Sequence, residues 1–308
     1  MKVVILCGGR GTRLQEQTQS IPKPLVEIGG RPIVWHVVQL YASHGLGDVV
    51  LACGYKAEMI ADFVASADWP AGTSVRCVDT GMDTPTGGRI KRLEDVVEGE
   101  RFCATYGDGL SDVDLQALLA FHGEHGALAT MTVVRPELQF GVTEVDGDHG
   151  RVTGFREKPR SEHWINGGFF VFEPAVFEYL SDSSVLEREP LEGLAADGQL
   201  HAFRHTGFWE CMDTYKDAVQ LNDLWAQGAG GRERVRAQQL LGLRPGRVVR
   251  DDDLPALAAE RLVLERVEQP AQPQRPVVAR DHDAELHAHT CHGASPCAHR
   301  SLSWTASL

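Results

Sequence analysis

The segment MKVVILCGGRGTRL (residues 1–14) sets the architecture of the N-terminal part of the chain. Its apolar run VVIL (3–6) is short and rich in β-branched residues, which predicts a buried strand. Three glycines follow this run, and glycine lets backbone N–H groups come close to an anion. A glycine-rich loop of this kind is more often a plain turn when it stands alone. The alternative is a phosphate-binding loop, and the rest of the sequence has to distinguish between the two.

The loop fits neither of the two familiar phosphate motifs. A Walker A loop ends in Gly-Lys-Ser/Thr and the dinucleotide fingerprint needs GxGxxG, whereas residues 8–14 read GGRGTRL. Arg10 and Arg13 would add positive charge, and Lys23 in the following PKP sequence can return to the same place. The segment therefore predicts an anion site without naming the anion.

Short β-rich runs alternate with longer amphipathic runs over residues 1–135. The predicted strands are 3–6, 48–53, 74–78, 101–107 and 128–134, and the predicted helices are 32–45, 56–67 and 114–126. Such alternation predicts a parallel sheet with helices on both faces. We therefore expect an α/β fold of three layers (α/β/α), Rossmann-like, with a mixed and mostly parallel sheet.

The pattern changes between residues 140 and 225. The stretch 142–158 predicts a hairpin, 165–174 predicts an apolar strand, and 175–182 and 213–225 have helical spacing. We expect these elements to extend the first sheet and to cover one end of it.

A linker and a spacer follow Trp225. They read AQGAGGRER (226–234) and QPAQPQRP (269–276), so we assign residues 1–230 to one domain and 231–308 to a linker with a low-order C-terminal extension. The extension contains clustered histidines and cysteines: His282, His287, His289, Cys291, His292, Cys297 and His299. Their spacing matches no zinc module, so a disordered extension is favoured over a zinc site.

Charge and composition exclude several classes of partner. The chain has 308 residues and a formal net charge of −13, which argues against nonspecific binding to nucleic acid or anionic membranes. No apolar stretch is long enough to cross a bilayer, and the polar loop begins too soon after Met1 for a secretory signal. We expect a cytoplasmic enzyme.

Two aspartates stand where a metal ion could be held. Asp108 follows a predicted strand within TYGDGLSD (105–112), and Asp213 precedes a predicted helix within FWECMDTYKD (208–217). Each one alone is typical of a turn residue or an N-cap. Together they suit Mg²⁺, which takes one or two carboxylates and completes its shell with waters and phosphate oxygens.

With the downstream sequence KPLVEIGGRP (23–32), the loop resembles the sugar-1-phosphate nucleotidyltransferase family. The family signature is GGxGTRL followed by KPxxxxxGxxP. The matching positions here are Gly8, Gly9, Gly11, Thr12, Arg13, Leu14, Lys23, Pro24, Gly30 and Pro32. The resemblance reaches about Trp225 and implies the nucleotide-diphospho-sugar transferase fold for residues 1–230.

The resemblance also implies the roles of individual residues. The implied catalytic residues are Arg13, Lys23, Asp108 and Lys158, with Asp108 and Asp213 as ligands of Mg²⁺. The implied nucleotide-binding residues are Leu6, Gly8, Gly9, Arg10, Gly11, Thr12, Arg13, Lys23, Thr84, Thr86, Arg89 and Gly107. The implied sugar-binding residues are Gly141, Glu157, Lys158, Asn166 and Gly167. Glu157 and Lys158 belong to FREKP (155–159), which by itself is typical of a solvated corner.

One segment distinguishes branches of the family. VDTGMDTPTGGRIKR (78–92) resembles the glucose-1-phosphate cytidylyltransferase branch, which implies CTP and glucose 1-phosphate as substrates and a homo-oligomeric protein. The link between CGYK (53–56) and VDTG (78–81) is shorter than in that branch. The alternatives are a thymidylyl- or uridylyltransferase acting on another sugar or polyol phosphate, and a non-catalytic homologue that binds sugar nucleotides.

Overall fold

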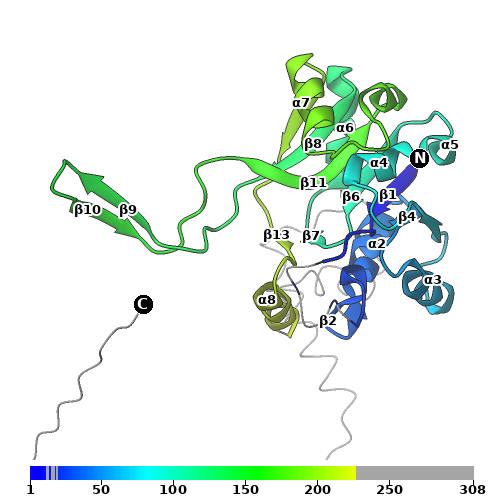
Figure 1. Cartoon of the computed structure of the whole chain (residues 1–308), viewed down its shortest axis with the longest axis horizontal. Helices are drawn as coiled ribbons and strands as arrows, with labels where there is room; N and C mark the ends of the chain where they lie inside the picture. Colours follow the sequence, from blue (N-terminus) through cyan, green and yellow to red (C-terminus); the bar gives the residue numbers. More distant parts are fainter. Residues whose placement is uncertain (12–13, 15–17, 19, 227–308) are drawn as a thin grey trace, which may run out of the picture. The chain divides into compact units, whose positions relative to one another are not determined.

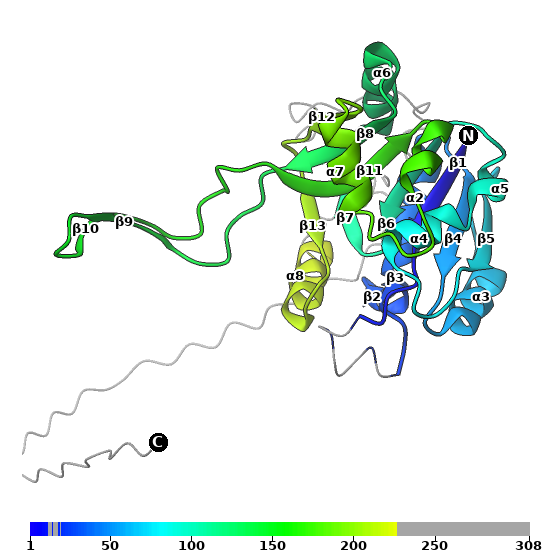
Figure 2. The same cartoon turned by 45° about the horizontal axis from the view of Figure 1, so that its top comes forward.

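The computed structural model describes residues 1–11, 14, 18 and 20–226 (Figures 1 and 2). Thr12 and Arg13 therefore lie outside the described residues, and so do the predicted linker, the C-terminal extension and its histidines and cysteines. Within the described part of the chain, no helix is both long and apolar enough to cross a membrane.

A seven-stranded sheet lies at the centre of the fold (Figure 1). In order across the sheet, its strands are β12 (Leu200–Arg204), β8 (Ala129–Val134), β11 (Ile165–Phe172), β6 (Phe102–Tyr106), β1 (Lys2–Leu6), β4 (Asp48–Cys53) and β5 (Ser74–Asp79). β11 is antiparallel to both β6 and β8, and the other neighbouring strands are parallel. The predicted mixed, mostly parallel sheet is confirmed.

Helices cover both faces of this sheet. The helices against one face are α2 (Ile33–Ser43), α3 (Ala57–Ser66) and α6 (Leu115–His125), and those against the other are α4 (Thr86–Lys91), α5 (Glu94–Val97), α7 (Glu189–Ala196) and the 3-10 helix η3 (Pro174–Tyr179). Successive side chains of a strand point to opposite faces. Val3 and Ile5 of β1 therefore enter the first core, while Val4 enters the second. The three-layer prediction is confirmed.

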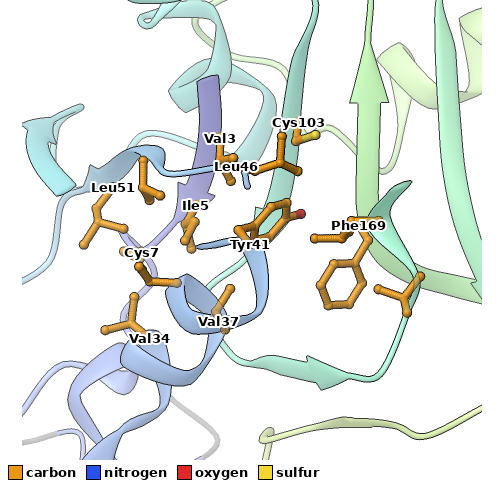
Figure 3. Close-up of a cluster of buried hydrophobic side chains, with 14 of the residues drawn as sticks. Val3, Ile5, Cys7, Val34, Val37, Tyr41, Leu46, Leu51, Cys103 and Phe169 are labelled. Carbon is orange, nitrogen blue, oxygen red and sulfur yellow. The ribbon is translucent and has the colours of Figure 1, made fainter. Parts of the chain in front are cut away.

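The first core places aromatic side chains between the sheet and α2 (Figure 3). Tyr41 of α2 and Phe169 of β11 are fully buried, with ring centroids 6.2 Å apart and planes inclined by 29°. Phe169 has a φ of +48° and follows Gly168 with a φ of +76°. The register of β11 shifts between Asn166 and Phe170, so the strand is irregular next to the predicted sugar-binding residues.

Local signals account for the helix ends and the long hairpin. The side chain of Asp114 caps α6 by accepting from the backbone N–H groups of Gln116 and Ala117, and Gly126 ends the helix with a φ of +65°. The predicted hairpin consists of β9 (Val142–Asp146) and β10 (Arg151–Arg156). The segment predicted as a helix after β11 forms the short 3-10 helix η3.

Two small two-stranded sheets were not predicted. β2 (Glu27–Ile28) pairs with β3 (Arg31–Pro32) after the 3-10 helix η2 (Lys23–Leu25). Gly29 and Gly30 connect them with φ values of +61° and +76°, as the primed two-residue turns require. A Cβ on Gly29 would lie 2.1 Å from Nε1 of Trp225 in α8 (Tyr215–Ala226). Gly29 and Gly30 of the signature therefore form a turn that packs against Trp225 of α8.

Candidate active site

The site lies at the carboxyl end of β1, where the order of the strands reverses. The chain continues from β1 to β4 on one side, and β6 lies on the other side. In open α/β sheets, ligands bind in the crevice at such a switch point. The loop after β1 begins at Cys7, whose N–H donates to the carbonyl of Ala52 at 3.0 Å. This position suits a loop that binds a ligand.

The two-stranded antiparallel sheet of β7 (Gly109–Ser111) and β13 (Trp209–Cys211) brings two distant aspartates together. Gly109 pairs with Cys211, and the N–H of Met212 donates to the carbonyl of Asp108 at 2.9 Å. Asp108 and Asp213 flank this pairing. Both therefore reach the same point in space despite their separation in the sequence.

Lys23 bridges the two aspartates. Its Nζ donates to Oδ2 of Asp108 at 2.5 Å and to Oδ1 of Asp213 at 2.7 Å. Burial favours a lower pKa for Lys23, but the carboxylates outweigh it, so its pKa is raised. Lys23 therefore stays cationic.

The two carboxylates also suit a divalent cation, because both already contact one ammonium group. In the described part of the chain, no group of three or more His, Cys, Asp or Glu side chains could hold a metal ion. A cation bound here would take two carboxylates from the protein and its other ligands from waters and substrate oxygens. That donor set is the one Mg²⁺ accepts beside phosphates.

Arg89 connects the loops of the site through hydrogen bonds to their backbones. Its guanidinium donates to five groups, which are the carbonyls of Gly8, Cys53, Gly81 and Met82 and the hydroxyl of Thr80. Only 4% of Arg89 is exposed. The contacts tie the loop after β1 to the end of β4 and to the loop after β5. The sequence predicted a nucleotide contact for Arg89, and the structure places its side chain among backbone carbonyls.

Arg89 also explains two glycines. A Cβ on Gly8 would lie 2.0 Å from Cζ of Arg89, and a Cβ on Gly54 would lie 2.4 Å from its Nη1. For Gly9, in contrast, no atom of the described residues lies within 4 Å of the place where a Cβ would stand. Gly8 and Gly54 therefore make room for the guanidinium, while no described residue occupies the space beside Gly9.

The other residues predicted on the nucleotide side are held by polar contacts. Arg10 pairs with Asp83 at 2.7 Å, and the hydroxyl of Thr84 donates to the carbonyl of Thr80 at 2.6 Å. The hydroxyl of Thr86 donates to Oε2 of Glu187 at 2.7 Å. Leu6 ends β1 and Gly107 follows β6, and Gly107 donates its N–H to the carbonyl of Leu6 at 3.1 Å. Gly11 lies in the loop after β1, and its carbonyl accepts from the hydroxyl of Thr18 at 2.9 Å.

The residues predicted for the sugar fall into two groups. Asn166 and Gly167 lie in β11, where Asn166 donates to the hydroxyl of Tyr106 at 3.1 Å and the carbonyl of Gly167 accepts from Trp209 at 2.7 Å. The second group flanks the β9–β10 hairpin and consists of Gly141, Glu157 and Lys158. Lys158 has an exposed side chain and a φ of +43°.

A comparison with protein families decides the class of the chain. The family model described as nucleotidyl transferase matches residues 2–220. The chain belongs to this family. The nucleotidyltransferase is 42% identical over 255 residues to the glucose-1-phosphate cytidylyltransferase of Salmonella typhi, covering 74% of this chain and 97% of that one. It is 41% identical over 249 residues to the "Probable glucose-1-phosphate cytidylyltransferase" of Bacillus subtilis (strain 168), with the same coverage.

Solved structures agree with the fold of the nucleotidyltransferase. It resembles HddC from Yersinia pseudotuberculosis with a TM-score of 0.58 and 25% identity, over 73% of this chain and 99% of that one. The predicted nucleotide-diphospho-sugar transferase fold is confirmed by such neighbours.

Sequence reasoning missed two polar residues of the site, Tyr106 and Glu187. Tyr106 ends β6 just before Gly107 and Asp108, and its hydroxyl donates to Oε1 of Glu187 at 2.6 Å. The position of Tyr106 at a strand end was the available signal. Glu187 is 81 residues away in the sequence and has no motif of its own.

Proposed function

We propose that this nucleotidyltransferase transfers the cytidylyl group of CTP to glucose 1-phosphate, giving CDP-glucose and pyrophosphate. The observation that supports it most is the 41–42% identity, over 97% of the relatives' length, to a glucose-1-phosphate cytidylyltransferase and a "Probable glucose-1-phosphate cytidylyltransferase". The arrangement of Lys23 between two carboxylates at the switch point supports the chemistry.

In this reaction an oxygen of the sugar phosphate attacks the α-phosphorus of the nucleotide, and the bond to pyrophosphate breaks. A phosphate monoester has a second pKa of about 6, so the nucleophile is already a dianion at neutral pH. A general base is therefore unnecessary. The enzyme has to bring two anions together in line and to stabilise the charge that develops.

The residues divide this task. Lys23 and Arg13 neutralise the triphosphate and the leaving pyrophosphate, while backbone N–H groups of the loop after β1 bind phosphate oxygens. Asp108 and Asp213 would hold Mg²⁺, which supplies positive charge at the phosphates when bound. Lys158 binds the sugar phosphate, and Glu157, Asn166, Gly141 and Gly167 bind the sugar. Arg89 fixes the carbonyls behind the loop that binds the nucleotide.

A substrate panel tests the proposal. The enzyme is incubated with Mg²⁺, each of CTP, dTTP, UTP, GTP and ATP, and each of several sugar 1-phosphates. Pyrophosphate release and the mass of the nucleotide sugar are then measured. CDP-glucose should be the main product, and EDTA should abolish its formation until excess Mg²⁺ is added. Absence of any CDP-sugar would refute the cytidylyl assignment.

The alternatives give other outcomes of the same panel. A product from dTTP or UTP alone would identify a thymidylyl- or uridylyltransferase. No product from any pair would favour the non-catalytic homologue, which the retention of Lys23, Asp108 and Asp213 disfavours. The predicted homo-oligomer is tested separately by light scattering coupled to size-exclusion chromatography.

A further inference from the structure

We propose that Glu187 is a positioning residue that joins the nucleotide-binding and sugar-binding segments of the site. The inference rests on the proposed function. Glu187 accepts one hydrogen bond on each carboxylate oxygen, from the hydroxyl of Tyr106 at 2.6 Å and from the hydroxyl of Thr86 at 2.7 Å. Tyr106 belongs to β6 and Thr86 begins α4, so one carboxylate connects two elements of the site.

The carboxylate fixes the direction of every hydrogen bond in this network. An ionised carboxylate only accepts, so both hydroxyls must donate to it and can only accept from their other partners. The hydroxyl of Tyr106 then accepts from Nδ2 of Asn166 at 3.1 Å, and the hydroxyl of Thr86 accepts from the N–H of Leu186 at 2.9 Å. Burial, followed by the charge of Glu187, raises the pKa of Tyr106, so its hydroxyl keeps the proton it donates.

On the sugar side, the network sets the orientation of Asn166. Because Nδ2 of Asn166 faces Tyr106, its Oδ1 is left to accept from the N–H of Gly168 at 2.8 Å. Gly168 lies in the irregular part of β11, and a Cβ there would come within 3.0 Å of the Tyr106 ring. Loss of the Tyr106 hydroxyl therefore removes one of the two hydrogen bonds that orient the Asn166 amide and weakens the orientation of the groups it offers to a sugar.

On the nucleotide side, the network holds the start of α4. The backbone of α4 also contacts the segment before α7, because the N–H of Gly88 donates to the carbonyl of Ser184 at 3.0 Å. Gly88 leaves no space there, since its Cβ would lie 2.2 Å from the carbonyl oxygen of Asp182. Arg89 comes next in α4 and binds the carbonyl of Gly8. Glu187 therefore acts on the phosphate loop through α4.

Kinetics of five variants test this proposal. Thr86→Val should raise KM for the nucleotide by about fivefold, Tyr106→Phe should raise KM for the sugar phosphate by about fivefold, and Glu187→Ala should raise both by about tenfold or more. Adding Tyr106→Phe to Glu187→Ala should raise the sugar-phosphate KM little further, because both changes break the same link. Glu187→Gln should recover most of the loss, since its amide can accept from Tyr106 and donate to Thr86.

Tyr179 supplies a matched control. Its hydroxyl donates to Oδ2 of Asp197 at 2.8 Å, which is also a tyrosine–carboxylate bond, but between η3 and the residue after α7. Tyr179→Phe should leave both KM values within twofold of the wild type. Thermal unfolding of every variant shows whether each one is folded.

The outcomes separate this inference from the proposed function. An active wild type with unchanged KM values in Glu187→Ala overturns the positioning role and leaves the proposed function standing. A drop in Tm with unchanged KM values also overturns it, because Glu187 would then only stabilise the fold. A folded wild type that converts no nucleotide and sugar-phosphate pair overturns the proposed function and this inference with it.

Discussion

The loop after β1 and the β9–β10 hairpin contain residues predicted to bind phosphates, but the protein holds them differently. Behind the loop, Arg89 is buried and donates to four carbonyls and one hydroxyl. Next to the hairpin, Glu157 and Lys158 are exposed, and so are the apolar side chains of Phe140 and Phe155. The segments predicted to bind the nucleotide are therefore built into the fold, while the residues predicted to bind the sugar phosphate have exposed side chains.

This contrast predicts different results of mutation in the two regions. Changes behind the loop should lower stability and activity together, because the same contacts serve the fold and the site. Changes beside the hairpin should lower activity alone, because exposed side chains contribute little to stability.

The largest effect on activity is expected where Lys23 bridges Asp108 and Asp213. Lys23→Ala and Asp108→Asn should each lower kcat by about 10²- to 10⁴-fold, because the first removes a positive charge that stabilises the anionic transition state and the second weakens the proposed Mg²⁺ site. Steady-state kinetics measure the activity of each variant, and circular dichroism shows separately whether it is folded. Lys91→Ala is the matched control, since Lys91 pairs with Glu94 on the surface at 2.7 Å. Near-normal turnover in either site variant would show that the catalytic assignment is wrong.

The next effect concerns two adjacent glycines of the loop. Gly8→Ala should lower the free energy of unfolding by about 1–3 kcal/mol, because its Cβ would overlap the buried guanidinium of Arg89. Gly9→Ala is the matched control and should leave the unfolding midpoint nearly unchanged, since no atom of the described residues lies within 4 Å of its Cβ position. Urea unfolding gives both values. Equal destabilisation by the two changes would contradict the role assigned to Arg89.

A change at Lys158 tests whether the exposed residues beside the β9–β10 hairpin affect activity without affecting stability. Lys158→Ala should raise KM for the sugar phosphate about tenfold without moving the unfolding midpoint, because the side chain is exposed and its charge meets the ligand. Arg151→Ala removes another exposed cation of the same hairpin, one that pairs with Asp146 at 3.3 Å, and serves as the control. Equal kinetic effects of the two changes would indicate a general effect of charge.

The smallest effect is a pH dependence of stability in the core beside α6. Burial, together with the charge of Arg101, lowers the pKa of His122, which contacts Thr130 at 2.8 Å and Glu173 at 3.2 Å. The unfolded chain then binds more protons at this position below pH about 6.5, so stability should fall as the pH drops through that value. His122→Gln should weaken this dependence in urea unfolding between pH 5 and 8 (about the range where histidine titrates). His149→Gln, in the exposed turn of the hairpin, should leave it unchanged.

Much of the fold was predictable from the sequence because its signals are local. The run VVIL predicted β1, and the helical spacing with Asp114 and Gly126 at its ends predicted α6 nearly to the residue. The signal for the two-residue turn at Gly29 and Gly30 was also local, but the two glycines were interpreted only as part of a binding signature. The resemblance to a family supplied the candidate residues, and their roles in this chain stay predictions.

By itself, the sequence determined six of the seven strands of the central sheet and the helices α2, α3, α6 and α8, because hydrophobic periodicity and capping act over a few neighbouring residues. Tertiary structure decided which polar groups meet. The pairing of β7 with β13 brought Asp213 to Asp108, and Lys23 reaches Asp213 across 190 residues of sequence. Folding also buried Arg89 among carbonyls and placed Glu187 between Tyr106 and Thr86. Such contacts depend on how whole elements pack, and no short stretch of sequence encodes that packing.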